Sequence, residues 1–276
     1  MRIKSFSKIN LTLRVLKKFK NGMHDIETNT VLINLFDEIS IKKSTKDIII
    51  FKGKFKNKIN LKKNSVVETL QLLRKFKILK NFYKIIIKKN IPVYAGLGGG
   101  TSNSASIVKY FSKKNLNEKL ITSYEKKIGS DFRLFLNNSS FQKNLGKVFK
   151  VKNNIQSPIM LVYPFINCKT KIIYKAVKNF NLPSGSHYLQ KINKKEFIET
   201  IKKDQNDLQK VVEKKYTRIS PLIKYINKQD GCIFSRMTGS GSACYGVFKS
   251  KKTAKFAMIK LKRKYPKYWC VVTKTI

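Results

Sequence analysis

Acidic residues are scarce in this chain. Its 276 residues include 15 Asp and Glu against 60 Lys and Arg, a formal net charge of +45. Such a charge is typical of nucleic-acid-binding proteins. The lysines, however, are spread along the whole chain, and only seven basic residues are arginine, which makes the bidentate contacts to bases and phosphates. An accompanying excess of Ile, Asn and Phe indicates that a coding bias, and not a binding face, accounts for the many lysines. The charge should still attract a polyanionic small molecule.

Histidine and paired cysteines are also lacking. The scattered cysteines form no C-x-x-C pair, and they are Cys168, Cys232, Cys244 and Cys270. With only His24 and His187 beside them, a zinc site or a disulfide framework is disfavoured, and no metal ligand is assigned. No apolar run approaches the roughly 20 residues of a membrane span, and residues 1–16 lack the apolar segment of a signal peptide. We therefore expect a cytoplasmic protein with no membrane partner.

Hydrophobic residues make up 42% of the chain, which is enough for a packed core. Alternation and β-branched residues predict strands at 2–16, 31–43, 83–92, 157–164, 243–248 and 268–274. Helical spacing predicts helices at 66–76, 105–111, 194–203, 206–216 and 251–264. Residues 123–136 read as a short helix, a Gly-Ser turn and then a strand or helix. We expect an α+β protein of two lobes, divided in the polar segment 152–158 into domains 1–155 and 156–276.

The segment IPVYAGLGGGTSNSAS, residues 91–106, holds four glycines: Gly96, Gly98, Gly99 and Gly100. Glycine is needed where the backbone approaches a ligand closely or takes a positive φ. A strand that ends at Pro92 and a helix that starts near 101–104 would place free N–H groups at a helix N-terminus, which binds phosphate. The hydroxyls of Thr101, Ser102 and Ser104 could cap the helix or reach a phosphate or a magnesium ion.

Common nucleotide motifs do not fit this segment. A Walker loop requires Gly-Lys-Ser/Thr, which does not occur in the chain, and the G-x-G-x-x-G pattern fails from both Gly96 and Gly98. A plain linker would lack the flanking strand and the periodic helix. The segment is therefore interpreted as a phosphate-binding loop of another kind.

Five motifs together resemble the GHMP superfamily of small-molecule kinases. They are SKIN at 7–10, NGMHDIET at 21–28, the glycine segment, IGSDFRLFL at 128–136, and NDL at 206–208 followed by SRMTGSGSACYGVF at 235–248. The resemblance spans essentially the whole chain. It implies an N-terminal lobe like the second domain of ribosomal protein S5 and a ferredoxin-like C-terminal lobe. It also implies ATP with Mg²⁺ as cofactor, and a monomer or homodimer.

The resemblance assigns roles to individual residues. Asp131 would be the catalytic base that accepts the substrate hydroxyl proton, and Lys8 would be its catalytic partner, since a cation there favours the ionised carboxylate and stabilises developing charge. The residues implied for ATP are Pro92, Ala95, Gly96, Leu97, Gly98, Gly99, Gly100, Thr101, Ser102 and Asn103. Those implied for the substrate are Asn10, His24, Tyr174, Gly239 and Ser240, with His24 and Tyr174 at a cytosine ring.

The substrate that this pattern implies is 4-diphosphocytidyl-2-C-methyl-D-erythritol, phosphorylated on its 2-hydroxyl in non-mevalonate isoprenoid synthesis. Met23 departs from the pattern, because the family commonly has a tyrosine there that stacks on cytosine; a thioether can still pack against a ring. Phe132 and Arg133 also depart from it. Three alternatives stay open: a GHMP kinase for mevalonate derivatives or homoserine, an inactive kinase, and a basic nucleic-acid-binding protein on the same scaffold.

Overall fold

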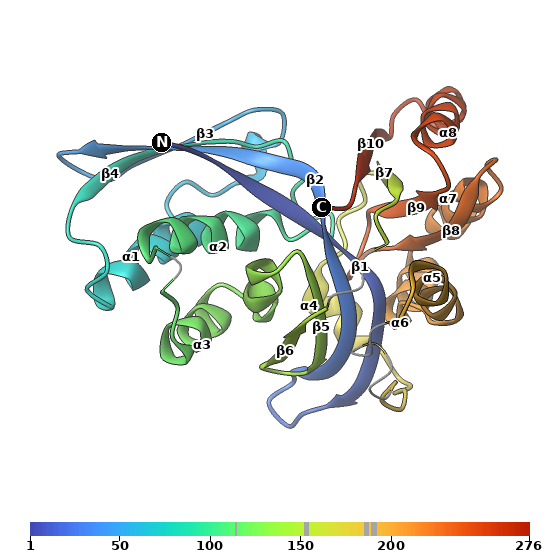
Figure 1. Ribbon diagram of the computed structural model, residues 1–276, viewed down its shortest axis with the longest axis horizontal. Coiled ribbons are helices and arrows are strands. Elements are labelled where there is room, and N and C mark those ends of the chain that lie inside the picture. The colour runs from blue at the N-terminus through green and yellow to red at the C-terminus, as the bar shows by residue number, and fades with distance from the viewer. Residues whose placement is uncertain (114, 152–154, 185–187, 189–191) are drawn as a thin grey trace. The chain divides into compact units, whose positions relative to one another are not determined.

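The computed structural model describes residues 1–113, 115–151, 155–184, 188 and 192–276 (Figure 1). His187 and part of the polar segment 152–158 lie outside these residues. The chain forms two compact units, and neither is continuous in sequence. Unit 1 consists of Met1–Lys8, Leu35–Val93 and Gly98–Asn137, and unit 2 of Ile9–Asn34, Tyr94–Leu97 and Asn138–Ile276. The chain is shared in this way because two long strands, β1 (Arg2–Lys18) and β2 (His24–Ser44), run through both units.

Unit 1 combines strands with helices. Its further elements are β3 (Ile48–Lys52), the 3₁₀ turn η1 (Lys56–Lys58), α1 (Ser65–Lys75), β4 (Phe82–Lys88), α2 (Gly99–Phe111), α3 (Glu118–Lys127) and the 3₁₀ helix η2 (Ser130–Leu136). Residues Glu38–Ser44 of β2 pair antiparallel with β4, and β4 pairs parallel with β3. Helix α1 begins where the Asn64 side chain accepts hydrogen bonds from the backbone N–H groups of Val66 and Val67. Its buried face packs against α2.

Unit 2 contains two sheet regions and five helices among its described residues. Its elements are β5 (Ser139–Asn144), β6 (Lys147–Lys150), β7 (Pro158–Tyr163), α4 (Thr170–Lys175), α5 (Lys194–Lys203), α6 (Asp207–Lys215), α7 (Ile219–Asn227), β8 (Cys232–Met237), β9 (Cys244–Phe248), α8 (Lys251–Lys264) and β10 (Trp269–Lys274). The first half of β2 pairs with β5, and β5 pairs with β6. A separate four-stranded sheet has the order β10-β7-β9-β8.

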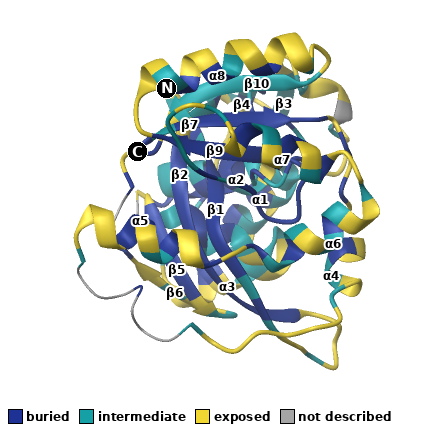
Figure 2. Ribbon diagram, turned by 90° about the vertical axis from the view of Figure 1, so that its right-hand side faces the viewer, coloured by how far each residue is buried: buried dark blue, intermediate teal, exposed yellow. Residues whose placement is uncertain are grey.

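One apolar core joins the parts of unit 2. It contains Leu13, Val15 and Ile26 from β1 and β2 together with buried residues of β7, β9 and helices α6, α7 and α8. Figure 2 shows α8 with an exposed outer face, as expected for a helix whose buried residues, Ala254, Ala257 and Leu261, recur every three or four positions. Its lysines therefore face solvent. In the described part of the chain no helix is long and apolar enough to cross a membrane.

The expected α+β class is confirmed, and the expected bounds of α5 and α8 match those observed. Two expectations around the glycine segment were wrong. Strand β4 ends at Lys88 and not at Pro92, and helix α2 begins at Gly99 and not near 101–104. Gly99 and Gly100 therefore form the first turn of the helix, which propensity alone disfavours. After Gly129 the chain forms the 3₁₀ helix η2, the helical of the two options.

Candidate active site

The N-terminus of α2 is the predicted phosphate-binding element, and Gly98 sets the backbone conformation at which this helix begins. This residue is the N-cap and takes the left-handed conformation, with φ 67° and ψ 24°. A Cβ added there would lie 2.5 Å from Cζ of the buried Phe135 ring. No acidic side chain occupies the first turn of α2. The first N–H groups of a helix have no intrahelical acceptor, so this end can receive an anion.

Lys8 and Asp131 lie together beside this helix end, as predicted for the catalytic pair. Lys8 Nζ is 3.4 Å from Asp131 Oδ2, and the two side chains are 3% and 37% exposed. The Lys8 side chain also passes Gly98, since a Cβ on Gly98 would be 3.5 Å from Lys8 Cε. A nearly buried cation, an accessible carboxylate and a helix N-terminus thus meet within unit 1.

Helix η2 carries Asp131 and is attached to α3 by two neighbouring residues. Phe132, which departs from the family pattern, is buried and stacks on Tyr124 of α3 with ring centroids 4.8 Å apart. Arg133, the other departure, bonds both Glu118 and Glu125 of α3, and these bonds raise its pKa. The two unusual residues therefore fix the segment that presents the carboxylate.

Side chains of the first α2 turns face the interior of unit 1. The Ser102 hydroxyl donates to the Phe6 carbonyl at 2.5 Å and lies 2.7 Å from the Ser5 hydroxyl. Asn103 Nδ2 donates to Ser5 Oγ and to Asp37 Oδ2, each at 3.0 Å. These side chains attach α2 to β1, the strand that carries Lys8. The Ser102 backbone N–H already donates to the Gly98 carbonyl at 2.8 Å, so the N–H groups left to serve a phosphate are those of the first turn, at Gly99, Gly100 and Thr101.

A buried ion pair that the sequence analysis did not identify completes this attachment. Lys89 Nζ forms an ion pair with Asp37 Oδ2 and donates to Asn103 Oδ1 at 2.9 Å. Asp37 Oδ1 accepts the backbone N–H groups of Asn90 and Ile91 at 2.8 and 2.9 Å. Both charged side chains are almost inaccessible to solvent. One carboxylate thus joins β2, the start of the glycine segment and α2.

In unit 2 the predicted substrate residues form two groups. In the first, the rings of His24 and Tyr174 lie 5.2 Å apart. Burial, followed by the effect of the Lys18 ammonium, lowers the pKa of His24, so its imidazole is neutral at neutral pH. Its Nε2 atom is buried and has no hydrogen-bond partner among the described residues.

The second group surrounds the turn at 238–242. The Asn10 backbone N–H donates to Thr238 Oγ1 at 3.0 Å, and its Nδ2 donates to Thr28 Oγ1 at 2.8 Å. Gly239 has φ 54°, and the Ser240 hydroxyl lies 2.9 Å from that of Thr170, which begins the helix carrying Tyr174. From the glycine segment, Ala95 accepts a bond from the Ala243 N–H, and a Cβ on Gly96 would lie 2.5 Å from the Thr238 carbonyl oxygen.

The remaining nucleotide candidates have simpler positions. Pro92 and Leu97 are buried, whereas Thr101 is partly exposed in the first turn of α2. The chain passes from unit 2 to unit 1 between Leu97 and Gly98.

Asn206, in the NDL motif, donates through Nδ2 to the carbonyls of Met237 and Gly239, each at 2.9 Å. Two motifs distant in sequence thereby stabilise one glycine turn.

Comparison with known proteins identifies the family. Residues 64–133 match the model of the GHMP kinases N terminal domain, and residues 187–267 match that of the GHMP kinases C terminal. A protein of Pelagibacter ubique (strain HTCC1062) named 4-diphosphocytidyl-2-C-methyl-D-erythritol kinase is 36% identical over 284 residues, covering 100% of this chain and 99% of the relative. The chain belongs to the GHMP kinases.

Other relatives and solved structures agree with membership of the GHMP kinases. A protein of the same name from Caldicellulosiruptor bescii is 32% identical over 273 residues, covering 95% of this chain and 94% of its own. A crystal structure of 4-(cytidine 5'-diphospho)-2C-methyl-D-erythritol kinase matches with a TM-score of 0.75 at 19% identity, covering 99% of each chain. A mevalonate kinase structure matches with a TM-score of 0.69 at 18% identity, covering 99% of this chain and 98% of its own. The expected GHMP fold is confirmed, but fold alone does not separate the substrates.

Substituting alanine for Gly98 tests the backbone of this kinase's helix end. We expect Gly98→Ala to lower the free energy of unfolding by about 2–5 kcal/mol, because a left-handed backbone costs a non-glycine residue about 1–2 kcal/mol and overpacking adds about 1–3 kcal/mol. Urea unfolding measures the loss. Gly146→Ala is the control, since Gly146 has φ 84° but no atom within 4 Å of an added Cβ. Equal losses in both variants would contradict a role for the Phe135 contact.

Proposed function

We propose that this GHMP kinase transfers the γ-phosphoryl group of ATP to the 2-hydroxyl of 4-diphosphocytidyl-2-C-methyl-D-erythritol. The observation that carries the chemistry is the Lys8–Asp131 pair, 3.4 Å apart beside Gly98. The substrate is supported by relatives of that name that match over nearly their whole length at 36% and 32% identity. A nucleic-acid-binding role has no comparable support.

In the proposed reaction Asp131 accepts the proton of the substrate hydroxyl. The hydroxyl oxygen then forms a bond to the γ-phosphorus while the bond from that phosphorus to the β–γ bridging oxygen breaks, so ADP leaves with the electron pair. The N–H groups at the start of α2 would bind phosphate oxygens. Lys8, almost buried, offers a positive charge where negative charge develops. Positioning and electrostatics thus supply most of the catalysis.

We propose Mg²⁺ as the companion of ATP. In proteins this ion usually binds through one or two carboxylates plus substrate phosphates and retains several waters. Within the described residues no three His, Cys, Asp or Glu side chains gather as a metal site. The accessible Asp131 carboxylate is the donor type that such an ion uses, and the ion would neutralise phosphate charge when bound.

The substrate residues are proposed to divide the molecule between them. His24 and Tyr174 would contact the cytosine, through an imidazole nitrogen and a ring face. Asn10, Gly239 and Ser240 would contact the polar remainder of the substrate. The residues proposed for ATP are those at the start of α2 and the segment before it, from Pro92 to Asn103. A division of the chain near residue 155, a cytoplasmic location and a monomer or homodimer also remain proposals.

A coupled assay of ADP release tests the substrate. The purified protein, with ATP and Mg²⁺, would be given the cytidyl substrate, mevalonate and homoserine in parallel. We expect turnover with the cytidyl substrate and at least about 100-fold lower kcat/KM with the other two, because a site built to hydrogen-bond and stack on a base rejects molecules that lack one. Turnover with mevalonate or homoserine alone would contradict the proposal. So would salt-dependent polynucleotide binding with no turnover of any substrate.

A further inference from the structure

His24 contacts a second aromatic ring, which no motif identifies. The ring of Phe180 lies 6.4 Å from that of His24, with an angle of 37° between the planes. Phe180 is 44% exposed, although it lies beside a buried histidine. Met23, the residue before His24, is also exposed and carries no ring. Phe180 and Tyr174 are thus the two rings that contact this imidazole among the described residues.

Phe180 belongs to a short strap, residues 180–184, that has no regular secondary structure. The strap is fixed through its backbone to the hairpin of β1 and β2. The Asn181 N–H donates to the Val15 carbonyl at 2.9 Å, and Arg14 Nη1 donates to the Leu182 carbonyl at 3.2 Å. The Ser184 N–H and hydroxyl both donate to Glu27 Oε2, at 2.6 and 2.7 Å. Exposure of Phe180 is therefore not a sign of a loose loop.

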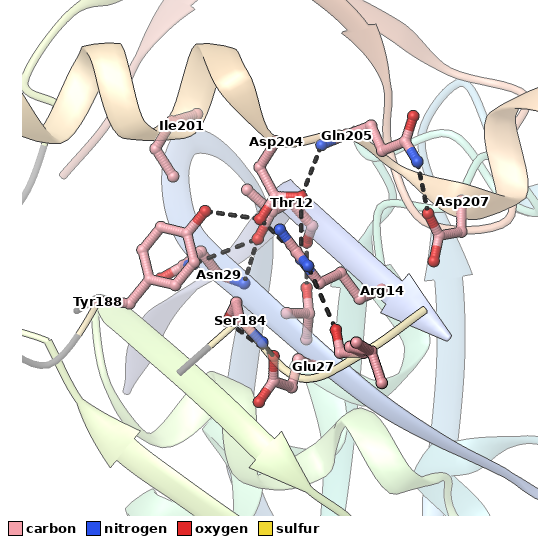
Figure 3. Close-up of polar contacts among 12 residues, drawn as sticks. Thr12, Arg14, Glu27, Asn29, Ser184, Tyr188, Ile201, Asp204, Gln205 and Asp207 are labelled. Atoms are coloured by element: carbon pink, nitrogen blue, oxygen red, sulfur yellow. Dashed lines mark hydrogen bonds and ion pairs between the residues drawn. The ribbon is translucent and has the colours of Figure 1, made fainter. Parts of the chain in front are cut away.

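Buried charges support this attachment (Figure 3). Glu27 is almost fully buried, and bonds from an N–H and a hydroxyl to a buried carboxylate are among the stronger hydrogen bonds. Arg14 is oriented by Asp204, whose two carboxylate oxygens each accept from Nε at 3.1 Å. Asp204 in turn accepts from the Tyr188 hydroxyl at 2.6 Å. Two carboxylates thus determine where the strap lies, as Figure 3 shows for Arg14, Glu27 and Ser184.

The features around His24 specify a kind of ligand. The buried imidazole nitrogen has no hydrogen-bond partner among the described residues, which is energetically unfavourable. A ligand that supplies a hydrogen bond would remove this cost. An exposed ring on a fixed strap offers an apolar face at little entropic cost. A planar heterocycle with polar edges satisfies both, because its edge can pair with the imidazole while its face lies on an aromatic ring. In the proposed substrate only the cytosine fits this description.

We propose that Phe180 is a specificity-determining residue that packs against the cytosine, and that Glu27 and Arg14 position it by holding the strap. This inference rests on the proposed function. It differs from a purely structural role, in which Phe180 merely covers His24 and Tyr174. A structural role would lower stability and every kinetic constant alike. A specificity role changes the binding of the cytidyl substrate and leaves that of ATP unchanged.

Cytidine 5'-diphosphate is the probe for this site, with its affinity measured by calorimetry in the presence of saturating ATP analogue. We expect Phe180→Ala to weaken its binding about 10-fold or more, in line with alanine substitutions of base-stacking rings. The KM for the cytidyl substrate should rise similarly, while kcat and the KM for ATP stay within about two-fold. Phe180→Tyr, which keeps the ring, should restore the affinity.

The strap itself offers a matched control. Leu182 is 83% exposed, and its backbone carbonyl, not its side chain, bonds Arg14. Leu182→Ala should therefore leave the affinity for cytidine diphosphate within about two-fold of wild type. Glu27→Gln, which keeps the shape but removes the charge, should weaken the probe several-fold and leave the KM for ATP unchanged.

The outcomes separate this inference from the proposed function. If the wild-type protein binds the probe and the Phe180→Ala variant binds it equally tightly, the inference alone is overturned. Equal weakening by Leu182→Ala would also overturn it, because strap disruption and not the ring would then be responsible. A wild-type protein that neither binds the probe nor phosphorylates the cytidyl substrate would overturn the proposed function and this inference together.

Discussion

Asp131→Asn is expected to fold like the wild-type protein and to lose about 10²–10⁴-fold of kcat, the range for loss of a general base. Asparagine keeps the size of the side chain and an oxygen that can accept from Lys8, but it cannot take the substrate proton. Asp131 is 37% exposed and the asparagine oxygen stays within reach of Lys8, so we expect the variant to remain folded. Steady-state kinetics and urea unfolding of the same preparation measure the two effects.

A matched control for this variant exists in the same unit. Glu38 forms an exposed ion pair with Lys88, with Nζ and Oε1 3.1 Å apart. Glu38→Gln therefore removes one carboxylate from one lysine in the same way, and we expect kcat to stay within two-fold of wild type. A kcat near the wild-type value for Asp131→Asn would exclude Asp131 as the base. Equal losses of kcat in both variants would point to a general effect of charge.

Local patterns predicted the elements of this kinase better than the boundaries near the glycines. Helices α5 and α8 were predictable because each follows a strong N-cap, Asn193 or Ser250, and has apolar residues at helical spacing. Helix α2 begins earlier than expected because its first turn is stabilised by packing, not by propensity. Gly99 fits against Ile91, where an added Cβ would lie 3.0 Å from Cγ2. A sequence does not reveal this kind of tertiary constraint.

The pair proposed as catalytic, Lys8 and Asp131, was predictable only through the family resemblance. Lys8 is one of many lysines and Asp131 follows a Gly-Ser turn, so neither residue stands out by composition or spacing. The strand β1 brings Lys8 beside Gly98, and η2, held by Phe132 and Arg133, brings Asp131 to Lys8. Phe180 gave no signal at all, because its contact with His24 depends on backbone bonds of the strap to distant strands.

Lys89→Met is expected to lower the free energy of unfolding by about 3–5 kcal/mol, because removing one partner of a buried ion pair leaves an uncompensated charge. Lys89 and Asp37 are both almost inaccessible, and Asp37 also accepts from Asn90, Ile91 and Asn103. The loss should therefore appear as a lower midpoint of urea unfolding. Lys88→Met is the control, since Lys88 is 58% exposed and its loss should change stability by less than about 1 kcal/mol.

Asp37→Asn, made in the wild-type protein and in the Lys89→Met variant, tests whether the charge of Asp37 or its hydrogen bonds stabilise the protein. In the wild-type protein it should destabilise, because Lys89 would become the uncompensated charge. In the Lys89→Met background the same change should stabilise, since it removes the buried negative charge while an amide oxygen still accepts the N–H groups of Asn90 and Ile91. A reversal of sign between the two backgrounds is what an ion pair predicts. Destabilisation of equal size in both would show that Asp37 acts through its hydrogen bonds, and that the charge of Lys89 contributes nothing to the attachment of α2.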